Sequence, residues 1–225
     1  MKFEQITLWT SRLEALYSFY KEQLGFPVLD RNEQSFTAAI GSTQLTFRGT
    51  TDHTDPFYHF AINIPENKLA EAKSWLKGKV ALIEEQGRDE VFFTSWDAGA
   101  VYFTDPAGNI IEFIARHQLK NSTEHPFALS DCIEISELGI ITAEVIPAVR
   151  ELNALGIPNW REDSEGLTPV GDEHGLFIVV KQAREWYFSG GRQAQFYPAE
   201  VVVASIGRIE FPHISQIHLL HNLGC

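Results

Sequence analysis

Hydrophobic and polar residues alternate over residues 3–9, which have the sequence FEQITLW. A period of two predicts a half-buried strand. A helix is expected next, because apolar residues then recur at helical spacing at Leu13, Leu16, Tyr17, Tyr20 and Leu24. Gly25 is typical of the end of such a helix. Short strands are predicted at residues 27–30, 36–40 and 44–48, so the first unit has the order β-α-β-β-β.

The same order of elements recurs in the next part of the chain. Residues 57–64 alternate as a strand, and Pro65 stands at the start of a predicted helix. Three further strands are predicted at residues 80–85, 99–104 and 109–114. The chain therefore contains at least two copies of one structural unit.

A third unit follows the first two. Residues 5–25 can be laid on residues 136–156 without a gap. Further along, residues 105–108 of the second unit correspond to residues 172–175 of the third. Both segments are typical of a turn that leads into an apolar strand. The strand predicted at residues 199–205 is expected to close this third unit.

These repeats predict a domain of two units, a linker, a third unit and a tail. The expected boundaries are residues 1–118 for the domain, with units 1–52 and 56–118, then 119–130, 131–205 and 206–225. Within the tail, residues 214–220 fit either a strand of an incomplete fourth unit or a docking helix.

Composition and charge restrict the partners. The 225 residues carry a formal net charge of −12, which argues against nucleic acid and anionic membrane surfaces as partners. The two cysteines, Cys132 and Cys225, make no disulfide framework. The N-terminus lacks an apolar signal core, and no stretch is apolar and long enough to span a bilayer. We therefore expect a cytoplasmic protein, and the charge by itself does not identify its partner.

Several segments carry a resemblance to a known family. They are residues 5–8 (QITL), 19–20 (FY), 24–26 (LGF), 58–61 (YHFA) and 105–112 (DPAGNIIE). Together they resemble the two modules of the vicinal-oxygen-chelate superfamily, which includes glyoxalases, bleomycin-resistance proteins and extradiol dioxygenases. The resemblance covers residues 1–115 well and residues 130–205 more loosely.

The resemblance implies an α+β fold in which paired βαβββ modules form an eight-stranded cup, here followed by a third, degenerate βαβββ module. It also implies a divalent metal in the cup. By position, the metal ligands are Gln5, His59 and Glu112, and Glu112 doubles as a proton acceptor in catalysis. Gln5 departs from the histidine of ring-cleaving dioxygenases, which favours the glyoxalase-like branch of the superfamily.

Strand alternation gives this ligand set partial support. If Glu112 faces a cavity, its neighbours Ile111 and Phe113 face the opposite side of the strand. A carboxylate that lies unpaired inside a core is costly, so a metal or a cationic partner is expected beside Glu112. The set suits Mn²⁺, Fe²⁺, Ni²⁺ or Zn²⁺. The expected substrate pocket is lined by Trp9, Arg48, Trp96 and Tyr102.

Other interpretations of the same residues remain open. Gln5 also fits a hydrogen-bonded strand residue, and His59 fits a core histidine with its hydrogen bonds satisfied. Glu112 also fits an ion pair with Arg48 or another basic residue. The third unit offers only Ser136 and Val179 at the ligand positions, which predicts a structural copy without a site. Its unpaired edge would be covered within the chain or in a homodimer.

Three functions follow from this sequence. The first is a metal-dependent lyase, isomerase or dioxygenase that acts on a small oxygenated molecule through Lewis-acid chemistry. The second is a metal-free protein that binds or sequesters a small molecule, such as a drug. The third is an inactive scaffold whose extra module serves assembly. The fold alone does not choose between them.

Overall fold

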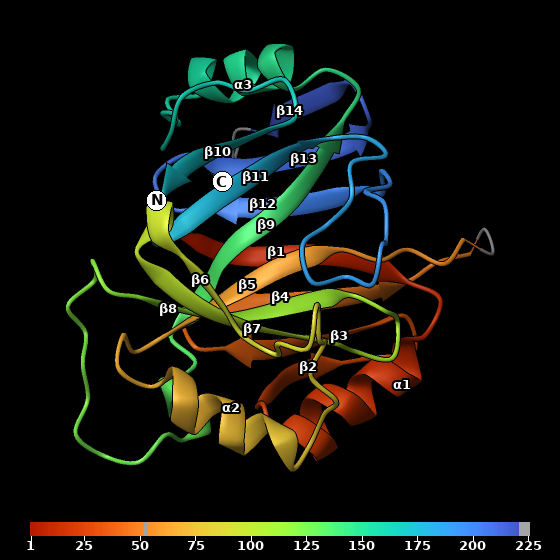
Figure 1. Cartoon of the computed structure of the whole chain (residues 1–225). Helices are drawn as coiled ribbons and strands as arrows, with labels where there is room; N and C mark the ends of the chain where they lie inside the picture. The colour runs from red at the N-terminus through yellow and green to blue at the C-terminus, as the bar shows by residue number, and fades with distance from the viewer. Residues whose placement is uncertain (52–53, 221–225) are drawn as a thin grey trace.

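The computed structural model describes residues 1–51 and 54–220, and two seven-stranded sheets dominate it (Figure 1). Sheet A has the strand order β14-β13-β12-β1-β4-β3-β2, and sheet B has the order β10-β11-β9-β5-β8-β7-β6. Helices α1 and α2 lie together at one end of the molecule, and α3 lies at the other end (Figure 1). None of the helices in the described ranges is long and apolar enough to cross a membrane.

Sheet A combines the first unit with the end of the chain. The elements of the first unit are β1 (Phe3–Thr10), α1 (Leu13–Ser18), the π-helix η1 (Phe19–Leu24), β2 (Val28–Arg31), β3 (Ser35–Ile40) and β4 (Thr43–Gly49). The end of the chain adds β12 (Ala199–Val203), β13 (Gly207–His213) and β14 (Gln216–Leu220). The parallel pairing of β1 with β4 and the antiparallel pairing of β1 with β12 join the two parts.

Sheet B combines the second and third units. The second unit contains β5 (His59–Ile64), α2 (Leu69–Lys77), β6 (Val91–Phe93), the short helix η2 (Thr94–Trp96), β7 (Ala98–Thr104) and β8 (Ile110–Arg116). After the short helix η3 (Leu129–Asp131), the third unit contains β9 (Glu134–Thr142), α3 (Val145–Ala154), β10 (Leu167–Asp172) and β11 (Gly175–Lys181). The antiparallel pairing of β5 with β9 joins the two units.

The α+β fold built from repeated βαβββ units is confirmed, but the units pair differently from our expectation. The first two units do not share an eight-stranded cup, because they lie in different sheets. An unpaired edge strand is a liability, and the chain supplies a partner for each opening strand: β12 covers β1, and β9 covers β5. The open edge that suggested a homodimer is therefore paired within the chain, and the homodimer stays a prediction.

The closing strand of the third unit and the tail also differ from expectation. The strand predicted at residues 199–205 was expected to complete the third unit, but residues 199–203 form β12 in sheet A, so the third unit has three strands. In the tail, the structure decides for strands, because β13 and β14 pair as an antiparallel hairpin. The last five residues of the expected tail, and residue 52 of the expected first unit, lie outside the described residues.

The sheets pack back to back around one large core. Ile6 and Leu8 of β1 belong to the same buried cluster as Phe60 and Ile62 of β5. Strand alternation therefore points the other side chains of each strand away from this shared core. The outer face of sheet B curves around a second, smaller apolar cluster that includes Tyr102. This outer face of sheet B holds the candidate site.

Gly41 lies at a tight junction between the two sheets. It occupies the turn between β3 and β4 with a φ of +56°, and a Cβ atom there would come within 2.0 Å of the Ile133 carbonyl oxygen. The next residue, Ser42, donates its N–H to the same oxygen over 2.9 Å. Only glycine fits at this position, because both the backbone angle and the space exclude a side chain.

We predict that Gly41→Ala lowers the free energy of unfolding by about 2 to 4 kcal/mol, since it adds a clash to the backbone strain. Gly87→Ala is the matched control, because Gly87 also has a positive φ of +75° but nothing lies within 4 Å of a Cβ there. That control should cost about 1 kcal/mol. Urea denaturation measures both values, and equal losses would show that the junction at Gly41 is not tight.

Candidate functional site

His59, Glu112 and Glu137 bring their side chains together on the outer face of sheet B. They come from β5, β8 and β9, which are neighbours in the sheet. One ligand atom from each lies within 4.8 Å of the other two, and all three residues are buried. His59 Nε2 and Glu112 Oε2 are 3.7 Å apart. One imidazole nitrogen and two carboxylates at this spacing form a donor set that fits a divalent metal ion.

The hydrogen bonding of His59 leaves its Nε2 atom available. Its Nδ1 atom lies 3.1 Å from the Ile110 carbonyl oxygen, which can only accept a hydrogen bond. Nδ1 therefore carries the proton, and the lone pair of Nε2 faces the carboxylates. Burial lowers the pKa of His59 to about 4, against a weaker opposing effect of the Ile110 hydrogen bond. The ring is therefore neutral near pH 7, as a metal ligand requires.

The two carboxyl groups are costly to ionise side by side. Burial raises the pKa of Glu112 well above its usual value, and the charge of Glu137 raises it further, while Tyr102 and Arg116 act in the opposite direction. Burial also raises the pKa of Glu137, and Arg116 lowers it. One guanidinium group faces two buried carboxyl groups here, so the cluster favours an additional cation or a bound proton.

Arg116 is buried and pairs with Glu137. Its Nη2 atom donates to Glu137 Oε1, and its Nε atom donates to Asn63 Oδ1 over 3.1 Å. Its Nη1 atom is buried without a hydrogen-bond partner among the described residues. The guanidinium carbon lies 5.5 Å from the centre of the Trp96 ring. Arg116 therefore fixes the position of Glu137 through a buried ion pair.

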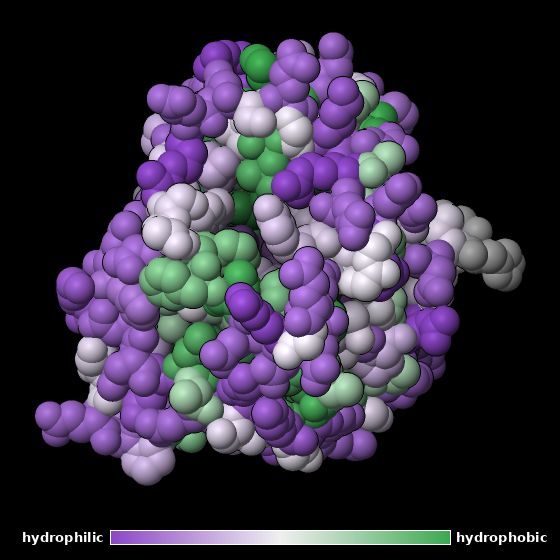
Figure 2. Space-filling view, in the orientation of Figure 1, coloured by the Kyte–Doolittle hydropathy of each residue, from purple (hydrophilic) through white to green (hydrophobic). Residues whose placement is uncertain are grey.

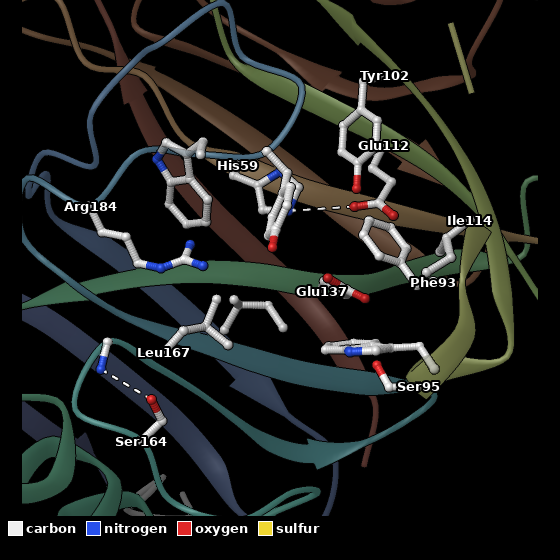
Figure 3. Close-up of a pocket in the computed structure, with 15 residues that line it drawn as sticks. His59, Phe93, Ser95, Tyr102, Glu112, Ile114, Glu137, Ser164, Leu167 and Arg184 are labelled. Atoms are coloured by element: carbon white, nitrogen blue, oxygen red, sulfur yellow. Dashed lines mark hydrogen bonds and ion pairs between the residues drawn. The ribbon is translucent and has the colours of Figure 1, made fainter. Parts of the chain in front are cut away.

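A cavity of about 380 Å³ opens in front of the three candidate ligands. Its wall contains Phe93, Trp96 and Tyr102 from the second unit and Trp186 and Tyr187 from the loop of residues 182–198 (Figure 3). Figure 2 shows apolar surface beside a hollow on the face of the molecule that Figure 1 presents. The combination of a mostly apolar wall and a few convergent polar groups is typical of a small-molecule site.

The loop of residues 182–198 is packed tightly against the strands that carry the ligands. The Trp186 ring lies 4.9 Å from the His59 ring, and the Phe188 ring stacks on Tyr102 at 5.2 Å. Arg192 fastens the far end of the loop, because it donates to the Gly108 carbonyl oxygen and lies 3.7 Å from the centre of the Phe57 ring. The loop thus forms a fixed wall of the cavity.

The structure brings together four of the seven residues expected at the site. His59 and Glu112 face each other, and Trp96 and Tyr102 line the cavity in front of them. The other three expected residues, Gln5, Trp9 and Arg48, lie in sheet A.

The placement of Gln5, Trp9 and Arg48 at this site is corrected. Their neighbours Ile6 and Leu8 fill the shared core, so these three side chains point to the opposite face of sheet A. Gln5 is exposed there and donates from Nε2 to Gln44 Oε1 over 3.4 Å. Both sheets therefore separate Gln5 from His59.

Arg48 and Trp9 also have surroundings other than those expected. Arg48 Nη1 lies 3.6 Å from Glu200 Oε1, so Arg48 does not pair with Glu112. Trp9 and Arg48 line a shallow depression on sheet A. Among the described residues, the sheet A face holds no cluster of three His, Cys, Asp or Glu ligand atoms.

Glu137 is the site residue that sequence reasoning missed. The gap-free comparison put Ser136 at the position of Gln5 and predicted that the third unit lacks a site. In the structure, the β5–β9 ladder shifts register between Ala61 and Ile62, which oppose Glu137 and Ile135, so Ser136 is the extra residue of a bulge. The bulge turns Glu137 toward the cavity. The sequence did contain a signal for this ligand, because an acidic residue, Glu137, directly follows Ser136.

The ion pair of Arg116 with Glu137 gives a prediction for stability. Arg116→Met should lower the free energy of unfolding of the metal-free protein by about 3 to 5 kcal/mol, because it leaves a buried carboxylate without its partner. The double variant Arg116→Met, Glu137→Met should regain most of that loss, since no uncompensated charge is left. A double-mutant cycle measured by urea denaturation tests this pair. The ion pair would be contradicted if the loss of stability in the double variant equalled the sum of the losses in Arg116→Met and Glu137→Met.

Comparisons with known proteins agree with this fold. A model of the Glyoxalase/Bleomycin resistance protein/Dioxygenase superfamily matches residues 2–113, which span the first two units. A model of a toxoflavin-degrading enzyme matches residues 135–184, which span most of the third unit and include Glu137. A search of curated protein sequences gives no match.

Solved structures show the same fold over most of the chain. A putative dioxygenase from Bacillus subtilis aligns over 80% of this chain and 63% of its own, with a TM-score of 0.55 and 15% identity. Glyoxalase I from Zea mays aligns over 80% of this chain and 66% of its own, with a TM-score of 0.53 and 16% identity. The chain thus spans slightly less than two thirds of each of these proteins. From the family match and the shared fold, we conclude that the chain belongs to the glyoxalase/bleomycin resistance protein/dioxygenase superfamily, also known as the vicinal-oxygen-chelate superfamily.

Proposed function

We propose that this protein binds a divalent metal ion through His59, Glu112 and Glu137 and acts on a small oxygenated molecule in the adjoining cavity. The observation that carries the proposal is the convergence of these three buried ligand atoms within 4.8 Å at the base of an aromatic cavity. Mn²⁺, Fe²⁺, Ni²⁺ and Zn²⁺ suit a donor set of one imidazole and two carboxylates.

The chemistry that a metal would supply here is Lewis-acid polarisation of two adjacent substrate oxygens. Such chemistry is common to lyases, isomerases and dioxygenases, and the proposed activity is of this group. Three protein ligands would leave coordination positions free for the substrate on the cavity side. The match of residues 135–184 to a model of a toxoflavin-degrading enzyme supports action on a small molecule, and Glu137 lies in that segment.

The chain's own residues prepare the site for this role. The Ile110 carbonyl fixes the tautomer of His59, and Arg116 holds Glu137 in place. Tyr102 lines the cavity with Glu112 and, against the larger effect of burial, lowers the pKa of that carboxyl group. We propose that Glu112 also accepts a proton from the substrate, because its carboxyl group lines the cavity in which the substrate would bind.

A metal-free binding protein is the second candidate function. Arg116 already balances one of the two carboxylates, so part of the charge that would attract a metal is satisfied within the chain. In that case the aromatic cavity would bind a small molecule without reaction. The two functions differ in one measurable property, the metal content of the purified protein.

Metal analysis separates the candidates. We expect close to one Mn²⁺, Ni²⁺ or Zn²⁺ per chain after purification without chelators, and an increase in thermal stability when metal is added. His59→Ala, Glu112→Gln and Glu137→Gln should each reduce metal affinity by about tenfold or more. Gln5→Ala is the control and should bind metal as the wild type does, because Gln5 lies on the other sheet.

Two results would refute the metal proposal. One is wild-type protein that contains no metal and whose stability does not respond to added Mn²⁺, Ni²⁺ or Zn²⁺. The other is a Gln5→Ala variant that loses metal while Glu137→Gln keeps it. Circular dichroism of each variant would show that the fold is intact.

A further inference from the structure

Arg184 is a cationic side chain in the cavity wall, and it belongs neither to the three candidate metal ligands nor to the ion pair of Arg116 with Glu137. It belongs to the loop of residues 182–198, and its guanidinium group points into the cavity (Figure 3). Its guanidinium group makes a weak hydrogen bond from Nη1 to the Glu185 carbonyl oxygen over 3.3 Å and lies 5.7 Å from the centre of the Tyr187 ring. Within residues 1–51 and 54–220, no carboxylate oxygen lies within 4.0 Å of a guanidinium nitrogen of Arg184.

The carboxylates of the site do not require Arg184 as a partner. Glu137 is already paired with Arg116. Glu112 interacts with Tyr102 and lies 3.7 Å from His59. The charge of Arg184 therefore remains available to a ligand, and guanidinium groups bind carboxylates through paired, charge-assisted hydrogen bonds.

The overall charge of the site also favours an anion. When Glu112 and Glu137 are both ionised, as metal ligands must be, they contribute two negative charges, and Arg116 and Arg184 contribute two positive charges, so these four side chains are balanced without the metal. A divalent ion would leave an excess of positive charge in a largely buried space. An anionic ligand would remove that excess, and this step of the argument depends on the proposed function.

The other residues of the cavity wall indicate which kind of apolar group the ligand carries. Trp96, Trp186 and Tyr187 offer ring faces, while Leu167 and Ile178 offer aliphatic contacts. A flat aromatic body suits such a wall, because rings stack well on aromatic side chains. The wall and Arg184 together therefore describe a ligand with an apolar ring and one negative group.

We propose that Arg184 is a specificity-determining residue that selects small aromatic carboxylates. The carboxylate of the ligand pairs with the guanidinium group near the cavity mouth. The ring lies between Trp186 and the opposite aromatic wall, and adjacent oxygens on the ring face His59, Glu112 and Glu137.

Two probes that differ by one carboxylate test this inference. Catechol carries two adjacent oxygens on a ring, and 3,4-dihydroxybenzoate carries the same two oxygens and a carboxylate. We expect isothermal titration calorimetry to show that the wild type binds 3,4-dihydroxybenzoate roughly tenfold tighter than catechol, as one partly exposed charge-assisted contact provides. Arg184→Gln should reduce that preference to about twofold or less, and Arg184→Lys should retain part of it.

Arg88→Gln is the matched control. It changes the net charge by the same amount, and Arg88 is exposed and does not line the cavity. Its preference for the carboxylate probe should equal that of the wild type, which would separate direct contact from a general effect of charge.

Each titration is run with Mn²⁺ and with EDTA, which separates this inference from the proposed function. Arg184 needs no metal to bind a carboxylate, so the preference should persist with EDTA. Loss of metal binding alone would refute the proposed function and leave this inference standing. The inference is overturned by equal binding of the two probes, by an unchanged preference in Arg184→Gln, or by no binding of 3,4-dihydroxybenzoate at about 10 mM.

Discussion

The antiparallel pairing of β5 with β9 is the constraint on which the site depends. β5 carries His59, its neighbour β8 carries Glu112, and β9 carries Glu137. Because the pairing joins the second unit to the third, the candidate metal centre belongs to neither unit alone. The bulge in this ladder then decides which acidic residue of β9 faces the cavity. One strand pairing thus sets the ligands, the cavity wall and the sheet that contains them.

The local part of this arrangement could be predicted from sequence. Alternation along residues 57–64 and 109–114 correctly put His59 and Glu112 on the face away from the shared core, and Tyr102 shares that face. The choice of partner between units could not be predicted in this way. Gln5, Trp9 and Arg48 occupy the analogous face of sheet A, where β1 pairs with β12, so both sheets separate them from His59.

A single extra residue explains why Glu137 was missed. The gap-free comparison was anchored on Gly25 and Gly156, which both end a helix with a positive φ. However, β1 ends at Thr10 and β9 ends at Thr142, and one residue fewer separates Thr142 from Gly156 than separates Thr10 from Gly25. The π-helix at residues 19–24 takes up the additional residue in the first unit. When the strands are matched by their ends, Glu137 corresponds to Gln5.

Anomalous X-ray diffraction from crystals loaded with Mn²⁺ or Zn²⁺ tests the central claim most directly, because it locates the ion without reference to activity. The account predicts one strong peak per chain, within about 2.0 to 2.3 Å of His59 Nε2 and of a carboxylate oxygen from both Glu112 and Glu137. A peak beside Gln5 on sheet A, or crystals without a peak among these three residues, would contradict it.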